Sequence, residues 1–213
     1  MTDPPIPTIV ALSGSLRHRS YNGIILETLR EQLQGLAKFQ IHSLREIPLY
    51  NEDADGPSAP SAVASLRAAI GAADALVIAS PEYNHGMSGV LKNALDWASR
   101  PHGDGALIGK RALAITSSPG ALGGVRAHAQ INETLLATSC RSMRRPQIVI
   151  PFVHEKIRDN RLADEATLAF IMASVQQLLV DVIEASGSHT VRTRSPFSTT
   201  TRIASGPRIA EPR

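Results

Sequence analysis

Cysteine and aromatic side chains are the two residue classes that this sequence of 213 residues nearly lacks. Cys140 is the single cysteine, so no internal disulfide can form, which favours a reducing compartment. Aromatic residues make up 4% of the chain against 43% for all hydrophobic residues, so the core must consist mainly of Ala, Leu, Val and Ile. A chain of this length suits one domain with a modest appendage.

Long apolar runs are also missing, because no stretch approaches the ~20 uninterrupted apolar residues that a membrane-spanning helix needs. The richest segment, 170–185, is interrupted by Gln176, Gln177 and Asp181. Residues 1–10 contain no basic side chain and no extended apolar region, so they do not read as a secretory signal. We therefore expect a cytoplasmic protein without a membrane segment.

A net positive charge is absent from most of the chain, although the whole sequence carries a net charge of +3 and a pI near 9.3. Residues 186–213 contain five arginines and one glutamate and so carry +4, which leaves −1 for residues 1–185. The basic segment shows no hydrophobic periodicity and is predicted to be a disordered tail. We expect residues 1–185 to form the domain, and nothing in that domain predicts a nucleic-acid-binding surface.

Motifs of several ligand-binding classes are missing too. The chain has neither a Walker-type Gly-Lys-Ser/Thr nor a G-x-G-x-x-G sequence. Its seven histidines include no pair at the i, i+4 spacing of a helical zinc site, so no metal site is predicted; they are His18, His42, His85, His102, His128, His154 and His189. Cys140 reads as a small buried residue, or alternatively as a thiol with a lowered pKa beside Arg141, Arg144 and Arg145.

What the sequence does contain is a regular alternation of strand-like and helix-like segments. The helical stripe Ile25, Leu29 and Leu33 is typical of a helix packed on a sheet. Strands that are apolar along their whole length, separated by helices, favour a parallel sheet covered on both faces. We predict an α/β, flavodoxin-like three-layer sandwich with a five-stranded parallel sheet in the order 2-1-3-4-5. The predicted strands are 8–12, 39–44, 75–79, 111–116 and 147–150, and the predicted helices cover 25–33, 63–72, 90–98, 125–137 and 171–182.

Ligands of such sheets bind beyond the carboxyl ends of the strands, at the switch point between strands 1 and 3. The loop that follows strand 1, residues 13–22, offers serine hydroxyls, an arginine and the N-terminus of a helix. Those groups together suit a phosphate dianion. The alternative is a plain capping turn with Ser20 or Asn22 as the N-cap residue.

Two further unusual loops should emerge at the same rim. Residues 80–89 combine a proline with two glycines, which favours a rigid turn with exposed N–H groups, and Tyr83 offers a stacking face. The alternative places Tyr83 in the core. Residues 116–126 contain three glycines, which allow a close approach of backbone to a ligand, or alternatively form a simple hinge.

The residues of these loops resemble one known family in particular. Gly-Ser-Leu-Arg-x-x-Ser-x-Asn at 14–22, Pro-Glu-Tyr-Asn at 81–84, Leu-Lys-Asn-Ala-x-Asp-Trp at 91–97 and Thr-Ser-Ser-x-Gly-x-x-Gly-Gly at 116–124 are similar to the motifs of the NADPH-dependent FMN reductase family. Within that family they resemble the branch of quinone, chromate and azo-dye reductases. The resemblance covers residues 8–185 and leaves the tail outside it.

The resemblance implies a role for each loop. The first loop would hold the FMN phosphate and ribityl chain, the second would line the isoalloxazine ring, and the third would close the other side. The chain's own His85-Gly86 depart from the family pattern, and Arg126 reads either as a partner for the donor's phosphate or as a helix-surface salt bridge. The implied cofactor-binding residues are Ser13, Ser15, Leu16, Arg17, Ser20, Asn22, Pro81, Glu82, Tyr83, Asn84, His85, Gly86, Ser117, Gly120, Gly123 and Gly124.

The activity that the resemblance implies is ping-pong transfer of two electrons from NADPH or NADH, through FMN, to a small acceptor such as a quinone, an azo compound, free flavin or chromate. No acid–base catalytic side chain is expected, because the cofactor carries the chemistry. The family also implies a homodimer or homotetramer. One alternative is a flavin-binding electron carrier or redox sensor, against which the near-neutral domain argues. The other is a binding protein whose FMN fold is vestigial and whose arginine tail contacts nucleic acid or an anionic membrane.

Overall fold

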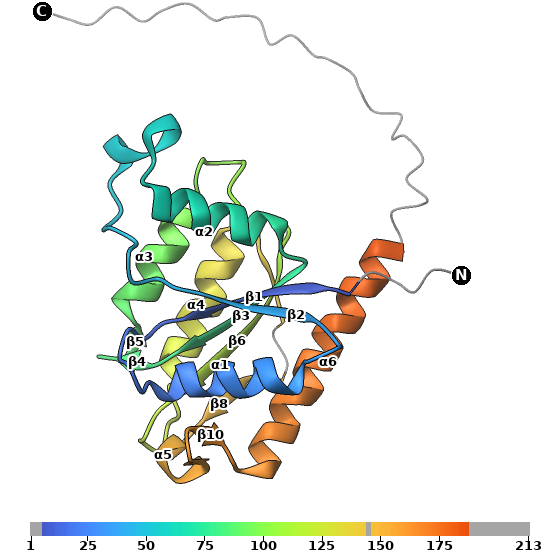
Figure 1. The fold of residues 1–213 in the computed structure, drawn as a ribbon. Coiled ribbons are helices and arrows are strands. Elements are labelled where there is room, and N and C mark those ends of the chain that lie inside the picture. Colours follow the sequence, from blue (N-terminus) through green and yellow to red (C-terminus); the bar gives the residue numbers. More distant parts are fainter. Residues whose placement is uncertain (1–5, 144–145, 188–213) are drawn as a thin grey trace, which may run out of the picture.

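A computed structural model describes residues 6–143 and 146–187 of the chain (Figure 1). Its centre is a parallel sheet in which β1 lies between β2 and β3, and β6 pairs with β3 on the other side. This is the predicted order 2-1-3-4-5, since β6 is the fourth long strand of the chain. The bounds of the sheet strands are β1 Thr8–Ser13, β2 Lys38–His42, β3 Ala75–Ser80, β6 Arg111–Ser117, β7 Arg141–Ser142 and β8 Ile148–Ile150.

The fifth position of the sheet is shared by two short strands, where the sequence predicted one. Strand β7 pairs with the beginning of β6, with Ser142 opposite Ala112. Strand β8 pairs with the end of β6, with Ile148 opposite Ile115. From Ser142 to Ile148 the outer segment advances by six residues, while β6 advances by three, from Ala112 to Ile115. The register therefore changes between β7 and β8, and β8 still pairs in parallel with the carboxyl end of β6.

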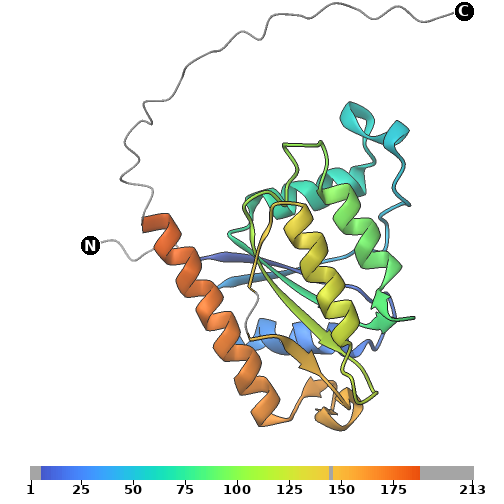
Figure 2. The ribbon, with the colours of Figure 1, turned by 180° about the vertical axis from the view of Figure 1, so that it is seen from behind.

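In the part of the chain that the structure describes, five helices of ten or more residues cover the two faces of the sheet. Helices α1 and α6 lie over one face, with Ile9 and Val77 of the sheet among their apolar neighbours (Figure 1). Helices α2, α3 and α4 lie over the other face, against Val10 and Leu76 (Figure 2). Alternate residues of each strand thus enter different cores, as the doubly covered sheet requires. The helix bounds are α1 Tyr21–Gln32, α2 Ser61–Ala72, α3 Gly89–Ala98, α4 Val125–Ala137 and α6 Glu165–Gly187.

Serine side chains fix where two of these helices begin. The Ser20 hydroxyl accepts a hydrogen bond from the Gly23 amide at 3.3 Å and caps α1. The Ser88 hydroxyl accepts one from the Leu91 amide at 3.3 Å and caps α3. Each cap of this kind stabilises a helix by about 1 kcal/mol. Both serines end loops at the carboxyl rim of the sheet, so the caps fix the directions in which those loops enter their helices.

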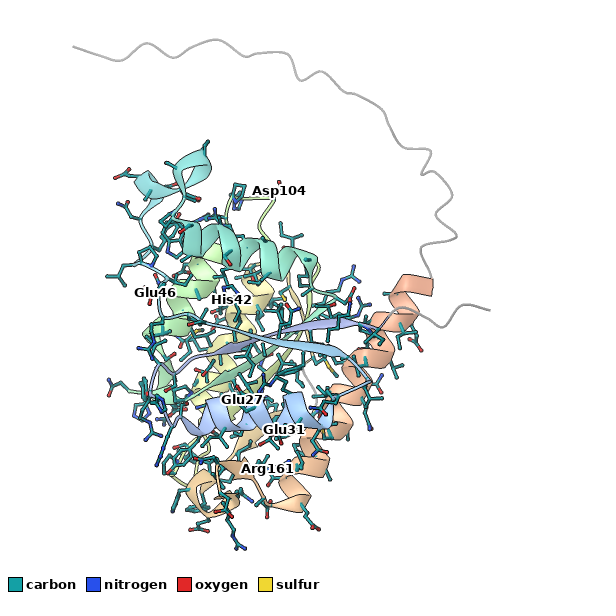
Figure 3. All side chains as sticks on the ribbon, viewed as in Figure 1. Glu27, Glu31, His42, Glu46, Asp104 and Arg161 are labelled. Atoms are coloured by element: carbon teal, nitrogen blue, oxygen red, sulfur yellow. The ribbon has the colours of Figure 1, made fainter. Side chains whose placement is uncertain are left out.

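Several short elements were not expected from the sequence. They include a β-hairpin between β8 and α6, in which Asp159 and Asn160 form the turn with φ of 49° and 57°. The hairpin packs on α1, because the Leu162 amide donates to the Thr28 hydroxyl at 3.1 Å. Arg161 and Glu31, labelled in Figure 3, form an ion pair beside that bond. The short elements are η1 Glu52–Ala54, η2 Gly56–Ser58, α5 Val153–Lys156, β9 Ile157–Arg158 and β10 Arg161–Leu162.

Helix α6 departs from the expectation that no segment is apolar enough to span a membrane. By length and composition alone, Glu165–Ala185 is the one helix among residues 6–143 and 146–187 that could do so. One face of it, including Ile171, Val175 and Leu178, is fully buried against the sheet. The helix continues to Gly187, past the predicted domain boundary at 185, and the tail predicted beyond it lies outside the described residues.

Cys140 is buried and its thiol donates to the Lys110 carbonyl oxygen at 2.9 Å. Burial raises the pKa of this thiol to about 12. The alternative of a thiol with a lowered pKa is therefore wrong, because removal from water outweighs the positive charge nearby.

Candidate functional site

Three loops meet at the carboxyl rim of the sheet because the strands before them are neighbours in register. Ser13 at the end of β1 lies opposite Ala79, and Ser80 at the end of β3 lies opposite Thr116. Ser117, in turn, lies opposite Ile150 of β8. The sequence placed its candidate residues in these three loops, and the topology brings the loops together.

The first loop, residues 13–20, is held by its own serines. The Ser13 hydroxyl accepts from the Ser15 amide at 3.3 Å, and the Ser15 hydroxyl accepts from the Arg17 amide at 3.4 Å. A side chain at Gly14 has no room, since its Cβ would lie 2.6 Å from the Ser80 hydroxyl oxygen and 2.8 Å from that of Ser88. The absence of a side chain therefore lets the first loop lie directly against the start of the second.

The N-terminus of α1 faces a cavity beside this loop. The amides of Tyr21 and Asn22 belong to the first turn, where N–H groups have no partner inside the helix. The cavity has a volume of about 620 Å³. Five predicted residues line it, namely Ser13, Ser15, Leu16, Arg17 and Ser20, whereas the other predicted residues do not. Ser20 is thus both the predicted cap and a lining residue.

The second loop is a miniature hairpin of β4, Glu82–Tyr83, and β5, Gly86–Met87. Its two turn residues, Asn84 and His85, have φ of 49° and 67°, as a two-residue hairpin turn with left-handed backbone requires. The side chain of Tyr83 is 54% exposed at the rim, so the alternative that places it in the core is wrong.

Glu82 and Gln130 tie this hairpin to α4. The Glu82 carboxylate accepts from the amides of Arg126 and Ala127 at 2.9 Å and 3.1 Å, which caps the beginning of the helix. The Gln130 side-chain carbonyl accepts from the Met87 amide at 2.6 Å. The Arg126 side chain contacts the ring of His85 and forms no ion pair with an acid in the described structure. Glu82 therefore positions a helix and a loop at once.

The third loop is a sequence of tight turns. The Ser118 amide donates to the Ile150 carbonyl at 3.1 Å, and the Gly123 amide donates to the Gly120 carbonyl at 3.2 Å. Gly123 adopts φ of 58°, and a Cβ there would lie 2.8 Å from backbone atoms of Ile150 and Pro151. The loop is therefore packed against the end of β8, and the simple hinge is not what the structure shows.

One hydrogen bond joins the first and third loops in the interior. The Ser117 hydroxyl donates to the side-chain oxygen of Asn22 at 3.0 Å, and both residues are buried. The hydroxyl of the preceding strand residue, Thr116, points to the opposite face of the sheet, where it is fully buried and has no hydrogen-bond partner in the described structure. A buried polar atom of this kind is uncommon and marks a place where a further donor or acceptor is needed.

Sequence reasoning missed one group at this site, Arg45. Its guanidinium donates to the Leu16 carbonyl at 2.8 Å, and it lines the cavity with His42 and Ser43 from the end of β2. No local pattern gives this contact, because the two residues lie 29 positions apart. Burial lowers the pKa of His42, whose ring stands at the cavity wall.

The residues present at the rim fit FMN. Serine hydroxyls, the start of a helix and arginines line the same cavity, which is the chemistry that holds a phosphate dianion. The backbone turns of the second and third loops, with exposed Tyr83 and unpartnered Thr116 beside them, suit the polar edge and flat face of a heterocycle. Among the described residues no group of three or more His, Cys, Asp or Glu side chains could hold a metal ion.

Fold and rim together define a flavodoxin-like α/β nucleotide-binding protein. The model of the family described as NADPH-dependent FMN reductase matches residues 7–155. The chain belongs to the NADPH-dependent FMN reductase family. It is an oxidoreductase whose cofactors are FMN and NAD(P)H.

Named relatives agree with this assignment. The chain is 36% identical over 171 residues to an NAD(P)H-dependent FMN reductase of Pseudomonas aeruginosa, covering 80% of this chain and 92% of that protein. It is 35% identical over 164 residues to a quinone reductase of Escherichia coli, covering 75% and 87%. The solved structure of FerB, a flavoenzyme NAD(P)H:(acceptor) oxidoreductase from Paracoccus denitrificans, is similar with a TM-score of 0.77 and 31% identity over 84% of this chain and 98% of that one.

Proposed function

We propose that this reductase passes two electrons from NAD(P)H to quinones and similar small planar acceptors at the rim formed by the three loops. The observation that carries the proposal is the meeting of the three loops at adjacent strand ends, with a cavity lined by serines and arginines beside one of them. Several relatives are themselves named quinone reductases. FMN supplies, when bound, the two-electron redox chemistry.

The chain's own residues hold and orient the cofactor. Ser13, Ser15, Arg17 and Ser20 bind its phosphate from the cavity wall and the start of α1. Asn22 and Ser117 fix the distance between the two loops on either side through their mutual hydrogen bond. Pro81 and the exposed turn at Asn84 and His85, together with Gly86, line one side of the ring, and the turn containing Gly120, Gly123 and Gly124 lines the other.

Glu82 acts through position rather than as an acid or base. Two backbone amides occupy one of its carboxylate oxygens, so the group holds α4 and the second loop at a fixed spacing. Tyr83 presents a half-exposed aromatic ring where a planar acceptor would stack. No side chain is required to carry covalent chemistry.

The experiment begins with the spectrum of the purified protein, followed by NADPH under anaerobic conditions. A yellow protein that bleaches within seconds, and that then reduces quinones faster than azo dyes, free flavin or chromate, supports the proposal. Bound flavin that stays oxidised indicates an electron carrier or sensor instead. A colourless protein that takes up no added FMN contradicts both.

The assembly and location follow the family. We expect a homodimer or homotetramer, because Leu122, Val125 and Leu136 expose apolar surface on and beside α4. Light scattering after gel filtration measures the oligomeric state.

We expect the protein to be in the cytoplasm, since Cys140 is a free thiol. We expect neither a nucleic-acid partner nor a membrane. Cell fractionation tests that expectation.

A further inference from the structure

The turn of the second loop places an exposed histidine beside an exposed arginine. His85 is the second turn residue of the β4–β5 hairpin, and its side chain is 71% exposed. Arg126 lies in the first turn of α4, and its amide donates to the Glu82 carboxylate of the same hairpin. The function proposed above gives the Arg126 side chain no role and uses His85 only as part of the turn.

The contact between these two side chains fixes where the imidazole carries its hydrogen. A guanidinium nitrogen of Arg126 lies within hydrogen-bond distance of His85 Nδ1. Because a guanidinium can only donate, Nδ1 is the acceptor and the ring hydrogen is on Nε2. His85 therefore presents an N–H donor on the other side of its ring. Arg126 uses one N–H group on His85 and has further donors in its planar fork.

The nearest carboxylate does not cancel this pair of donors at the surface. Glu82 Oε1 lies 3.6 Å from His85 Nδ1, but the Glu82 side chain is only 14% exposed. The other carboxylate oxygen accepts two backbone amides at the beginning of α4. In the described part of the chain, the Arg126 guanidinium forms no ion pair of its own. The negative charge therefore faces the helix, and the guanidinium and imidazole donors face solvent.

These donors lie next to the ring on which we expect an acceptor to stack. Tyr83 is on the same hairpin and its side chain is 54% exposed. Its partner on β5 is Gly86, so the opposing strand contributes no side chain beside the Tyr83 ring. His85 is one of the two turn residues between Tyr83 and Gly86. A planar acceptor on Tyr83 would therefore have the His85 and Arg126 donors at its edge.

We propose that His85 and Arg126 bind an anionic substituent of the acceptor, a sulfonate or a carboxylate, so that acidic quinones are preferred to neutral quinones with the same ring. This site rests on the proposed function, because it selects among acceptors of the same reaction. Such anions offer two or more oxygen atoms, which match a guanidinium fork and an adjacent imidazole N–H. The site takes no part in bond making, so it selects by binding alone.

The first test measures binding without turnover. Oxidised, FMN-loaded protein without any nicotinamide is titrated calorimetrically with 1,4-naphthoquinone-2-sulfonate and with 2-methyl-1,4-naphthoquinone. We expect the sulfonate to bind about 10-fold more tightly, as a charged hydrogen bond implies, and we expect Arg126→Gln to abolish the difference. Equal affinities in the unchanged protein, or a difference that survives in Arg126→Gln, would overturn the proposal.

The second test compares matched variants in steady-state turnover. We expect Arg126→Gln to lower kcat/KM for the sulfonate by about 10- to 100-fold, and that for the neutral quinone by less than about threefold. Arg126→Lys keeps the charge without the fork and should lose less. His85→Asn removes the ring but keeps a residue that tolerates left-handed backbone, and should cost the sulfonate about 3- to 10-fold. Arg141→Gln removes an exposed arginine at the opposite end of the sheet and should change neither value.

Equal losses for both quinones in Arg126→Gln would contradict the proposal, since they would report a general disturbance of the rim. A loss confined to kcat/KM for NADPH would also contradict it, because Arg126 would then serve the phosphate of the donor. Flavin content measured by absorbance shows whether a variant has lost FMN. If the unchanged protein retains FMN but reduces neither quinone, the proposed function fails, and the titration without nicotinamide still decides whether the anion site exists.

Discussion

Replacing Gly123 by alanine isolates the contribution of the third loop to the stability of the rim. Gly123 has φ of 58°, and its added Cβ would meet Val149 at 2.7 Å and backbone atoms of Ile150 and Pro151 at 2.8 Å. A left-handed backbone costs a non-glycine residue roughly 1–2 kcal/mol, and overpacking costs about 1–3 kcal/mol more. We expect Gly123→Ala to lower the free energy of unfolding by about 2–5 kcal/mol.

Gly120→Ala is the matched control in the same loop. The nearest atom to its added Cβ is the Ser118 hydroxyl oxygen at 3.5 Å, an ordinary contact, and its φ lies outside the left-handed range. We expect its unfolding free energy to change by no more than about 1 kcal/mol, with a slight gain from the stiffer unfolded chain. The two variants carry the same chemical change, so their difference reports local geometry alone.

Urea denaturation of the flavin-free proteins, followed by far-UV circular dichroism, measures both variants, and removing flavin avoids stabilisation by the ligand. With a denaturant slope of about 2 kcal/mol per molar, Gly123→Ala should lower the midpoint by roughly 1–2.5 M. Coincident midpoints for Gly123→Ala and Gly120→Ala would refute the reasoning, because the close approach of β8 would then carry no cost. FMN titration of the same proteins should show weaker binding for Gly123→Ala.

The remaining predictions concern three single residues. Arg17→Ala should weaken FMN binding by about 1.5–3 kcal/mol in calorimetry, and unchanged affinity would mean that the phosphate lies elsewhere. Burial lowers the pKa of His128, so the unfolded state binds the proton more readily and stability should fall as the pH drops below about 6.5. His128→Gln should flatten that part of a urea-midpoint profile between about pH 5 and 8, and an unaltered slope would assign it to other groups. Cys140, whose pKa burial raises to about 12, should react with a thiol reagent only after unfolding, and rapid labelling of the native protein would disprove its burial.

The sequence predicted best those features in which the conformation of a residue depends on its close neighbours in the chain. Apolar strands such as 75–79 and helical stripes such as Ile25, Leu29 and Leu33 predicted the sheet, its order and its covering layers, and the structure confirms them. The predicted ends of the strands were within a few residues of those observed. Because parallel strands end at one rim, the same pattern also indicated where the three loops would meet.

Features that depend on contacts between residues far apart in the sequence could not be predicted from such local patterns. The β9–β10 hairpin consists of two-residue strands that the Thr28 hydroxyl holds in place from α1. Arg45 reaches the cavity only because β2 lies beside β1 in the folded sheet. The capping role of Glu82 likewise needs α4 to begin beside the second loop. None of these contacts leaves a local pattern in the sequence.

The interrupted outer edge beside β6 has a consequence for how copies of this chain can associate. Along the described part of this edge, an incoming extended peptide would meet the two short paired segments Arg141–Ser142 and Ile148–Ile150, which differ in register against β6. Such short, broken edges disfavour pairing between sheets of different molecules. Two copies of this chain that associate at the β7/β8 edge would therefore contact each other through helices and loops. The two sheets would not join into one, so the flavin-binding loops of each copy would belong to its own sheet.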